Sequence, residues 1–158
     1  MEKKVHFYHK TISIWNSLCE HHKNLLDQTS KEYFNLLSSE MEKVEDSIKE
    51  KEHTIKAISK IDLARNELLE EINKEFSTNI QNFFELNGFF SDLPFEKENK
   101  HLNKFNQVLK ECIKSIQEQN KTNQLFINKA IINLDKIKNA GASNKSFNLY
   151  NSSGALKK

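Results

Sequence analysis

Through residues 41–76 most apolar residues follow one another at steps of three or four, and neither proline nor glycine occurs anywhere before residue 88. This spacing places apolar side chains along one face of a helix that packs against other helices. Because nothing in the stretch interrupts the backbone hydrogen bonds, it predicts one long central helix. The apolar residues of this helix face, called the seam below, are Met41, Val44, Ile48, Ile55, Ile58, Ile61, Leu68, Leu69, Ile72 and Phe76.

Charged residues interrupt the seam, because Lys51, Asp62 and Arg65 fall on or beside the same face. An unpaired charge in a helical core is costly, so Arg65 needs a carboxylate or several carbonyl groups. We expect an ion pair with Asp62 or with a first-helix acid such as Glu32. The alternative is a polar hole that receives an acidic group of a partner.

The whole chain predicts an all-α fold. With 158 residues it is long enough for one domain with its own core. It has only one proline and three glycines, the residues that usually mark the turns between strands. We expect an antiparallel up-down-up bundle of three long helices with coiled-coil-like packing, followed by a flexible C-terminal tail. The helical bundle takes residues 1–138 and the tail takes 139–158. The predicted helices run over about 8–37, 40–86 and 102–138.

Two joints connect these helices. Ser39 and Glu42 fit a capping box, which predicts a tight turn at 38–40, although an unbroken helix through that point stays open. The second joint, at 83–101, carries five phenylalanines. Asp92 is a candidate cap for a short helix with Pro94 in its first turn. We expect the aromatic stretch 83–95 to fold over the end of the bundle and fill its core. The alternative is an exposed apolar patch that binds a partner.

The third helix has amides inside its seam, since Asn120 and Asn123 fall among apolar residues and need buried partners. The tail contains no acidic residue but gathers Phe147, Leu149 and Tyr150. An apolar cluster in such a tail is typical of a docking segment, with a frayed terminus as the alternative.

Composition excludes several classes of function. Net charge is +2 and Arg65 is the only arginine, so nucleic-acid binding is disfavoured. No apolar run reaches the length of a signal peptide or a membrane span, which indicates a cytosolic protein with Cys19 and Cys112 as reduced thiols.

A zinc site from Cys19, His22 and Cys112 is the metal site that the sequence offers, but buried thiols are commoner in helical cores. We find no catalytic motif, so we expect no enzyme, no metal and no cofactor.

Three local patterns are spread along the chain. The first helix has Trp15 and several leucines, and the central helix has Lys51, then Arg65 and a leucine pair. The third pattern is the two asparagines of the last helix before Phe126-Ile127, with Tyr150 and Gly154 in the tail. Together these patterns resemble the FlgN-like flagellar type III export chaperones, and the similarity spans about residues 11–154.

The resemblance implies a protein of the bacterial cytosol. Such chaperones bind the C-terminal segments of the hook–filament junction proteins (hook-associated proteins), keep them monomeric and deliver them to the export apparatus. It also implies that the last helix and tail engage the substrate protein, and that Tyr150 docks on the cytosolic domain of the flagellar export gate. The predicted substrate-binding residues are Asn120, Asn123, Phe126, Ile127, Ile131, Leu134, Phe147 and Leu149.

The residues themselves fit this role, because an apolar groove along a helix receives a partner helix without any catalysis. The competing hypothesis is a structural helical-bundle interaction protein or a self-associating coiled coil. A homodimer of the free protein is open under both hypotheses. A lipid-surface protein is disfavoured, since Glu and Lys alternate on the polar faces.

Overall fold

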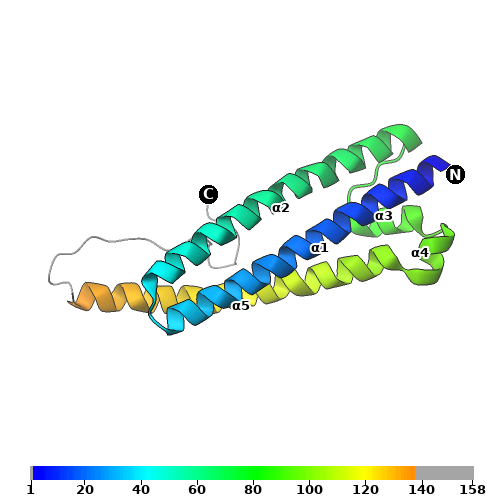
Figure 1. Ribbon diagram of the computed structural model, residues 1–158. Coiled ribbons are helices and arrows are strands. Elements are labelled where there is room, and N and C mark those ends of the chain that lie inside the picture. Colours follow the sequence, from blue (N-terminus) through cyan, green and yellow to red (C-terminus); the bar gives the residue numbers. More distant parts are fainter. Residues whose placement is uncertain (1, 138–158) are drawn as a thin grey trace. The chain divides into compact units, whose positions relative to one another are not determined.

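The computed structural model describes residues 2–137, and within them it contains five helices (Figure 1). They are α1 (Glu2–Leu37), α2 (Met41–Phe76), α3 (Phe83–Phe90), α4 (Pro94–Asn99) and α5 (His101–Ile137). No strand occurs in this range, which confirms the all-α prediction. The up-down-up orientation of the long helices stays a prediction. None of the helices between residues 2 and 137 combines the length and apolar character that crossing a membrane requires.

Helix boundaries differ from the predicted ones at two points. Helix α1 begins at Glu2 rather than near residue 8, and α2 ends at Phe76 rather than near 86. Ser77 ends α2 because its φ of 53° lies in the left-handed region, and the Thr78 amide donates to the Asn73 carbonyl at 3.1 Å. The Asn73 side chain then accepts from the Ile80 amide at 2.8 Å, which holds the chain away from a helical course.

A tight turn at 38–40 separates α1 from α2, as predicted, but no capping box forms it. Ser39 has a φ of 57°, and the Glu40 amide donates to the Asn35 carbonyl at 3.1 Å. This is the left-handed C-terminal motif that glycine usually makes. Its signal in the sequence is weak, because a serine replaces that glycine.

The chain divides into two compact units. Unit 1 comprises Met1–Lys23 and Ile55–Cys112, and its buried side chains are almost all apolar. The buried apolar residues of unit 1 are Tyr8, Trp15, Leu18, Cys19, Ile58, Leu68, Ile72, Ile80, Leu86, Phe90, Leu93, Leu102 and Leu109. Unit 1 therefore has an ordinary hydrophobic core, to which α3 and α4 contribute.

Unit 2 comprises Asn24–Thr54 and Ile113–Lys158, and the interior of its described part is unusually polar. Its buried apolar residues are Leu25, Val44, Ile116 and Ile127, and its buried polar residues are Thr29, Glu32, Ser47, Lys51, Thr54, Asn120 and Asn123. Because polar groups gain little from burial itself, unit 2 depends on hydrogen bonds among them. The prediction of a single bundle domain over residues 1–138 with a tail at 139–158 stays a prediction.

The phenylalanine-rich joint is buried in part and exposed in part. Phe90 is fully buried, with its ring 5.5 Å from that of Tyr8, whereas Phe84 is 85% exposed and Phe95 is 52% exposed. Pro94 opens α4 as expected, but Asp92 is not the cap, because Leu93 occupies that position and Asp92 pairs with Lys4 at 2.7 Å.

Buried Glu96 joins α4 to the start of α5. Its carboxylate accepts from the Tyr8 hydroxyl at 2.9 Å and from the backbone amides of Leu102 and Asn103 at 3.0 and 3.3 Å. The first amides of a helix have no partner within the helix, so this acidic side chain satisfies two of them and complements the positive end of the helix dipole. The bonded carboxylate also helps to raise the pKa of Tyr8, after burial as the main cause.

Replacing Glu96 tests this cap. We expect Glu96→Ala to lower the free energy of unfolding by about 2–3 kcal/mol, because three hydrogen bonds to a buried carboxylate are lost. Glu98→Ala, on the same short helix but exposed, should change it by less than about 0.5 kcal/mol. Urea denaturation measures both variants, and equal effects would contradict the capping role.

Candidate functional site

The two seam asparagines of α5 lie in the core of unit 2, as predicted. Asn120 is 5% exposed and Asn123 is 1% exposed. The Asn123 amide group donates to the Thr29 carbonyl at 2.9 Å and to Glu32 Oε1 at 2.7 Å, and Gln119 donates to its Oδ1 at 3.0 Å. Asn123 therefore ties α5 to α1 with all of its polar atoms engaged.

A buried ion pair completes this polar cluster. Lys51 Nζ lies 3.2 and 3.4 Å from the two carboxylate oxygens of Glu32, and it donates to Asn120 Oδ1 at 3.0 Å. Lys51 and Glu32 are 1% and 3% exposed. The cluster, defined as Thr29, Glu32, Lys51, Asn120 and Asn123, thus joins α1, α2 and α5 within unit 2.

Burial and pairing act in opposite directions on Lys51. Loss of solvation lowers the pKa of its ammonium group, and the neighbouring Glu32 carboxylate opposes that shift. The Nδ2 group of Asn120 is buried without a hydrogen-bond partner among the described residues. The cluster is therefore a costly arrangement whose groups depend on one another.

The expected pairing of Arg65 is resolved in favour of Asp62. Arg65 Nη2 lies 3.2 Å from Asp62 Oδ1, one helical turn away on α2. Glu32, the alternative partner, is bound to Lys51 instead. The sequence placed Lys51 on the seam, but it gave no signal that the lysine rather than the arginine would take the buried acid.

The apolar residues predicted to bind substrate have different environments. Ile127 is 4% exposed, and Ile131 is half-buried. Phe126 is also half-buried, with its ring 5.5 Å from that of Tyr33. The side chain of Leu134, together with Phe147, Leu149 and Tyr150, lies outside the described residues.

Two other apolar residues of α5 are more than half exposed, and neither was predicted to bind a partner. Leu125 is 63% exposed and Ile132 is 53% exposed. Seven positions separate them, so they lie on one face of the helix, about 180° around the axis from Asn123. A signal existed in the sequence, because Leu125-Phe126-Ile127 and Ile131-Ile132 are apolar runs, and a helix cannot bury consecutive residues on one face.

More apolar surface lies beside the α1–α2 turn of unit 2. Phe34 is 66% exposed, Leu37 is 49% exposed and Met41 is 37% exposed. Exposed residues of this size are typical of surfaces that meet another polypeptide. Unit 2 therefore combines a polar interior with large apolar side chains left in solvent.

The thiols and histidines considered for zinc do not gather into a site. No group of three or more metal-ligating side chains occurs among the described residues. The Cys19 thiol donates to the Phe105 carbonyl at 3.2 Å, and burial raises its pKa, which disfavours the thiolate that a metal needs. Burial lowers the pKa of His22, whose Nδ1 lies 2.7 Å from the Leu18 carbonyl.

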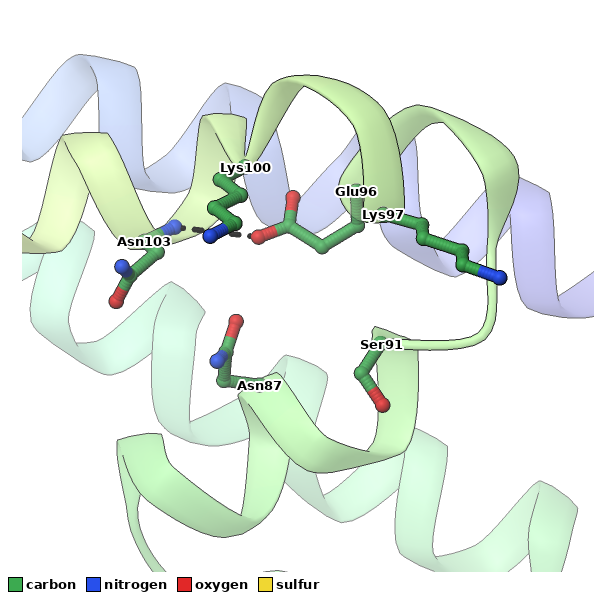
Figure 2. Close-up of a pocket in the computed structure, with 6 residues that line it drawn as sticks. All are labelled: Asn87, Ser91, Glu96, Lys97, Lys100 and Asn103. Atoms are coloured by element: carbon green, nitrogen blue, oxygen red, sulfur yellow. Dashed lines mark hydrogen bonds between the residues drawn. The ribbon is translucent and has the colours of Figure 1, made fainter.

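A polar cavity of about 350 Å³ adjoins α3, α4 and the first turn of α5 (Figure 2). Figure 2 shows the Glu96 side chain directed from α4 toward Asn103, with Asn87 of α3 pointing into the same space. The Glu96 carboxylate is already occupied by its three donors. Within this lining, the Glu96 carboxylate therefore serves to cap α5.

One comparison with known proteins identifies a family. A family model described as "FlgN protein" matches residues 1–158, which is the whole chain. No curated protein and no solved structure matches the chain.

The buried ion pair yields a testable prediction. We expect Lys51→Met to lower the free energy of unfolding by about 3–5 kcal/mol, because it leaves the Glu32 carboxylate buried without its counter-charge. Glu32→Gln combined with Lys51→Met should recover most of that loss, since the glutamine oxygen still accepts from Asn123. Lys49→Met, at an exposed position of α2, is the matched control in urea denaturation. If the double variant were no more stable than Lys51→Met, the pairing would not be the source of the loss.

Proposed function

This chain belongs to the FlgN protein family, and on that premise we propose that it is a cytoplasmic export chaperone for the hook-associated proteins of the flagellum. It binds the C-terminal helical segments of these hook–filament junction proteins and keeps them monomeric. It then delivers them to the type III export apparatus. The family supports the role in flagellum assembly, and the choice of client and the delivery step are our proposal.

The observation that carries the proposal is the exposed apolar face of α5. Leu125 and Ile132 stay largely in solvent although the same helix buries Asn120, Asn123 and Ile127. An amphipathic client helix has apolar residues at the matching spacing and gains free energy by covering such a face. Half-buried Phe126 and Ile131 extend the surface that a client can cover.

The buried residues among those predicted to bind the substrate protein have a structural role in this proposal. Asn120, Asn123 and Ile127 are packed inside unit 2, so we assign them to holding α5 rather than to touching the client. Leu134, Phe147 and Leu149 keep their proposed role as client contacts. Tyr150 keeps its proposed role in docking on the cytosolic domain of the export gate.

A self-associating bundle is the competing function that the same apolar face favours. Exposed Leu125 and Ile132 would then be covered by a second copy of the chain. Light scattering of the protein with and without a hook-associated protein fragment separates the two functions. A chaperone forms a stable complex with the fragment, whereas a structural dimer keeps its mass.

Polar substitution of the α5 face tests client binding. We expect Leu125→Ser with Ile132→Ser to weaken binding of a C-terminal hook-associated protein fragment by about 10- to 100-fold, because two apolar contacts are lost. The free energy of unfolding should change little, since both side chains are exposed. Lys129→Ser, an exposed change on the same helix, is the matched control in calorimetry. Unchanged affinity in the double variant would remove this face from the proposal.

The tail separates client binding from docking on the export gate. We expect Tyr150→Ala to leave the fold and client affinity intact while binding to the cytosolic domain of the gate falls, because an aromatic anchor is lost. Asn151→Ala is the neighbouring control, and pull-down with each partner gives the measurement. Deleting residues 139–158 should weaken both interactions. Gate binding that is equal in Tyr150→Ala and in the unaltered chain would contradict the docking role.

A further inference from the structure

A second cavity, of about 240 Å³, lies within unit 1 and surrounds the lone arginine of the chain. Helices α1, α2, α3 and α5 all contribute to its walls. Its lining includes Trp15, Arg65, Leu69, Phe83, Leu86 and Asn106. The proposed client surface on α5 belongs to unit 2, so this cavity has no part in the function assigned so far.

Arg65 has most of its hydrogen-bonding capacity unused. A guanidinium group carries five N–H donors, and the contacts of Arg65 among the described residues engage one nitrogen, Nη2, with Asp62. The side chain is 34% exposed, and its Cζ lies 5.9 Å from the centre of the Trp15 ring. Contact with the indole face holds a guanidinium in place and leaves its edge open to a ligand.

Aromatic, aliphatic and amide side chains form the remaining walls of the cavity. Trp15 is 3% exposed, and its indole N–H donates to Asn106 Oδ1 at 3.3 Å. The Phe83 ring lies 5.8 Å from the indole ring, and Leu86 is buried beside this region of α3. Apolar rings next to an arginine edge match a ligand that has a carboxylate adjacent to an aromatic or aliphatic group.

The size of the cavity indicates what kind of ligand carries those groups. Small-molecule sites usually enclose about 300–1,000 Å³, so a volume of about 240 Å³ suits one or two side chains of a longer polypeptide better than a whole metabolite. Phe84, the residue after Phe83, is 85% exposed and adds apolar surface for such a chain.

We propose that the cavity around Arg65 and Trp15 is a docking site for an acidic residue of a partner polypeptide that follows an aromatic residue. The carboxylate pairs with the free edge of the Arg65 guanidinium, and the aromatic group packs on half-buried Phe83 above the Trp15 ring. The site deepens the proposed function by assigning the chaperone's partner a second, acidic contact. It rests on that function only for the identity of the polypeptide.

The single tryptophan of the chain is a built-in reporter, because all tryptophan fluorescence arises at this cavity. We would titrate the full chain with acetyl-Phe-Glu-amide and with the matched neutral peptide acetyl-Phe-Gln-amide. We expect a saturable change in fluorescence, with the glutamate peptide binding about tenfold more tightly than the glutamine peptide. No saturable change, or equal binding of the two peptides, would overturn the proposal.

Variants assign the preference to Arg65. Arg65→Gln should remove the tenfold difference between the peptides, whereas Lys60→Gln, an exposed cation on α2, should retain it. Circular dichroism establishes that each variant is folded. Phe83→Ala is a second variant that keeps Arg65, and it should weaken both peptides equally while the preference for glutamate remains. A preference that persists in Arg65→Gln would overturn the assignment.

One further outcome distinguishes a polypeptide from a small free acid as the source of the carboxylate. A second distinguishes failure of this proposal from failure of the proposed client binding on α5. Binding of free phenylacetate as tight as that of the glutamate peptide would overturn the assignment to a polypeptide. The peptide titration requires no hook-associated protein, so failure of client binding at Leu125 and Ile132 leaves its result unaffected. Conversely, loss of the peptide preference does not alter the test of the α5 face.

Discussion

The ion pair between Lys51 and Glu32 is the interaction on which the described part of unit 2 depends. A lysine in an apolar seam loses its hydration, and a carboxylate at 3.2 Å together with the amide oxygen of Asn120 offsets that loss. Unit 2 buries few apolar side chains, so it has little hydrophobic stabilisation with which to offset a misplaced charge. Its helices must therefore meet in the one register that brings these groups together.

That register also decides which face of α5 is left for a partner. Asn120 and Asn123 are three residues apart and point toward α1 and α2, because Lys51, Glu32 and the Thr29 carbonyl bind them there. Leu125 and Ile132 then lie on the opposite side of the helix. The polar interior and the apolar exterior of unit 2 are two consequences of the same rotation of α5.

Unit 1 reaches its stability by a more usual route. Its interior is apolar, and its buried carboxylate, Glu96, is satisfied by a hydroxyl and two helix-end amides rather than by a cation. Helix α3 and the residue before α4 bury Leu86, Phe90 and Leu93, whereas Phe84 and Phe95 stay in solvent. Unit 1 thus has an apolar core together with a cavity that contains Trp15, Phe83 and Arg65.

The sequence by itself determined the helical class and the burial of Lys51, Asn120 and Asn123. Those features follow from spacing alone, because apolar residues at steps of three and four and the lack of glycine and proline act locally along the chain. The sequence also offered Asp62 as a local partner for Arg65, three residues away on the same helix. Only the tertiary structure decided that Glu32 binds Lys51 rather than Arg65, since a seam pattern does not say which helices meet at which height. It also decided that Leu125 and Ile132 stay exposed, because two adjacent apolar runs compete for the interior and only long-range packing selects which is buried.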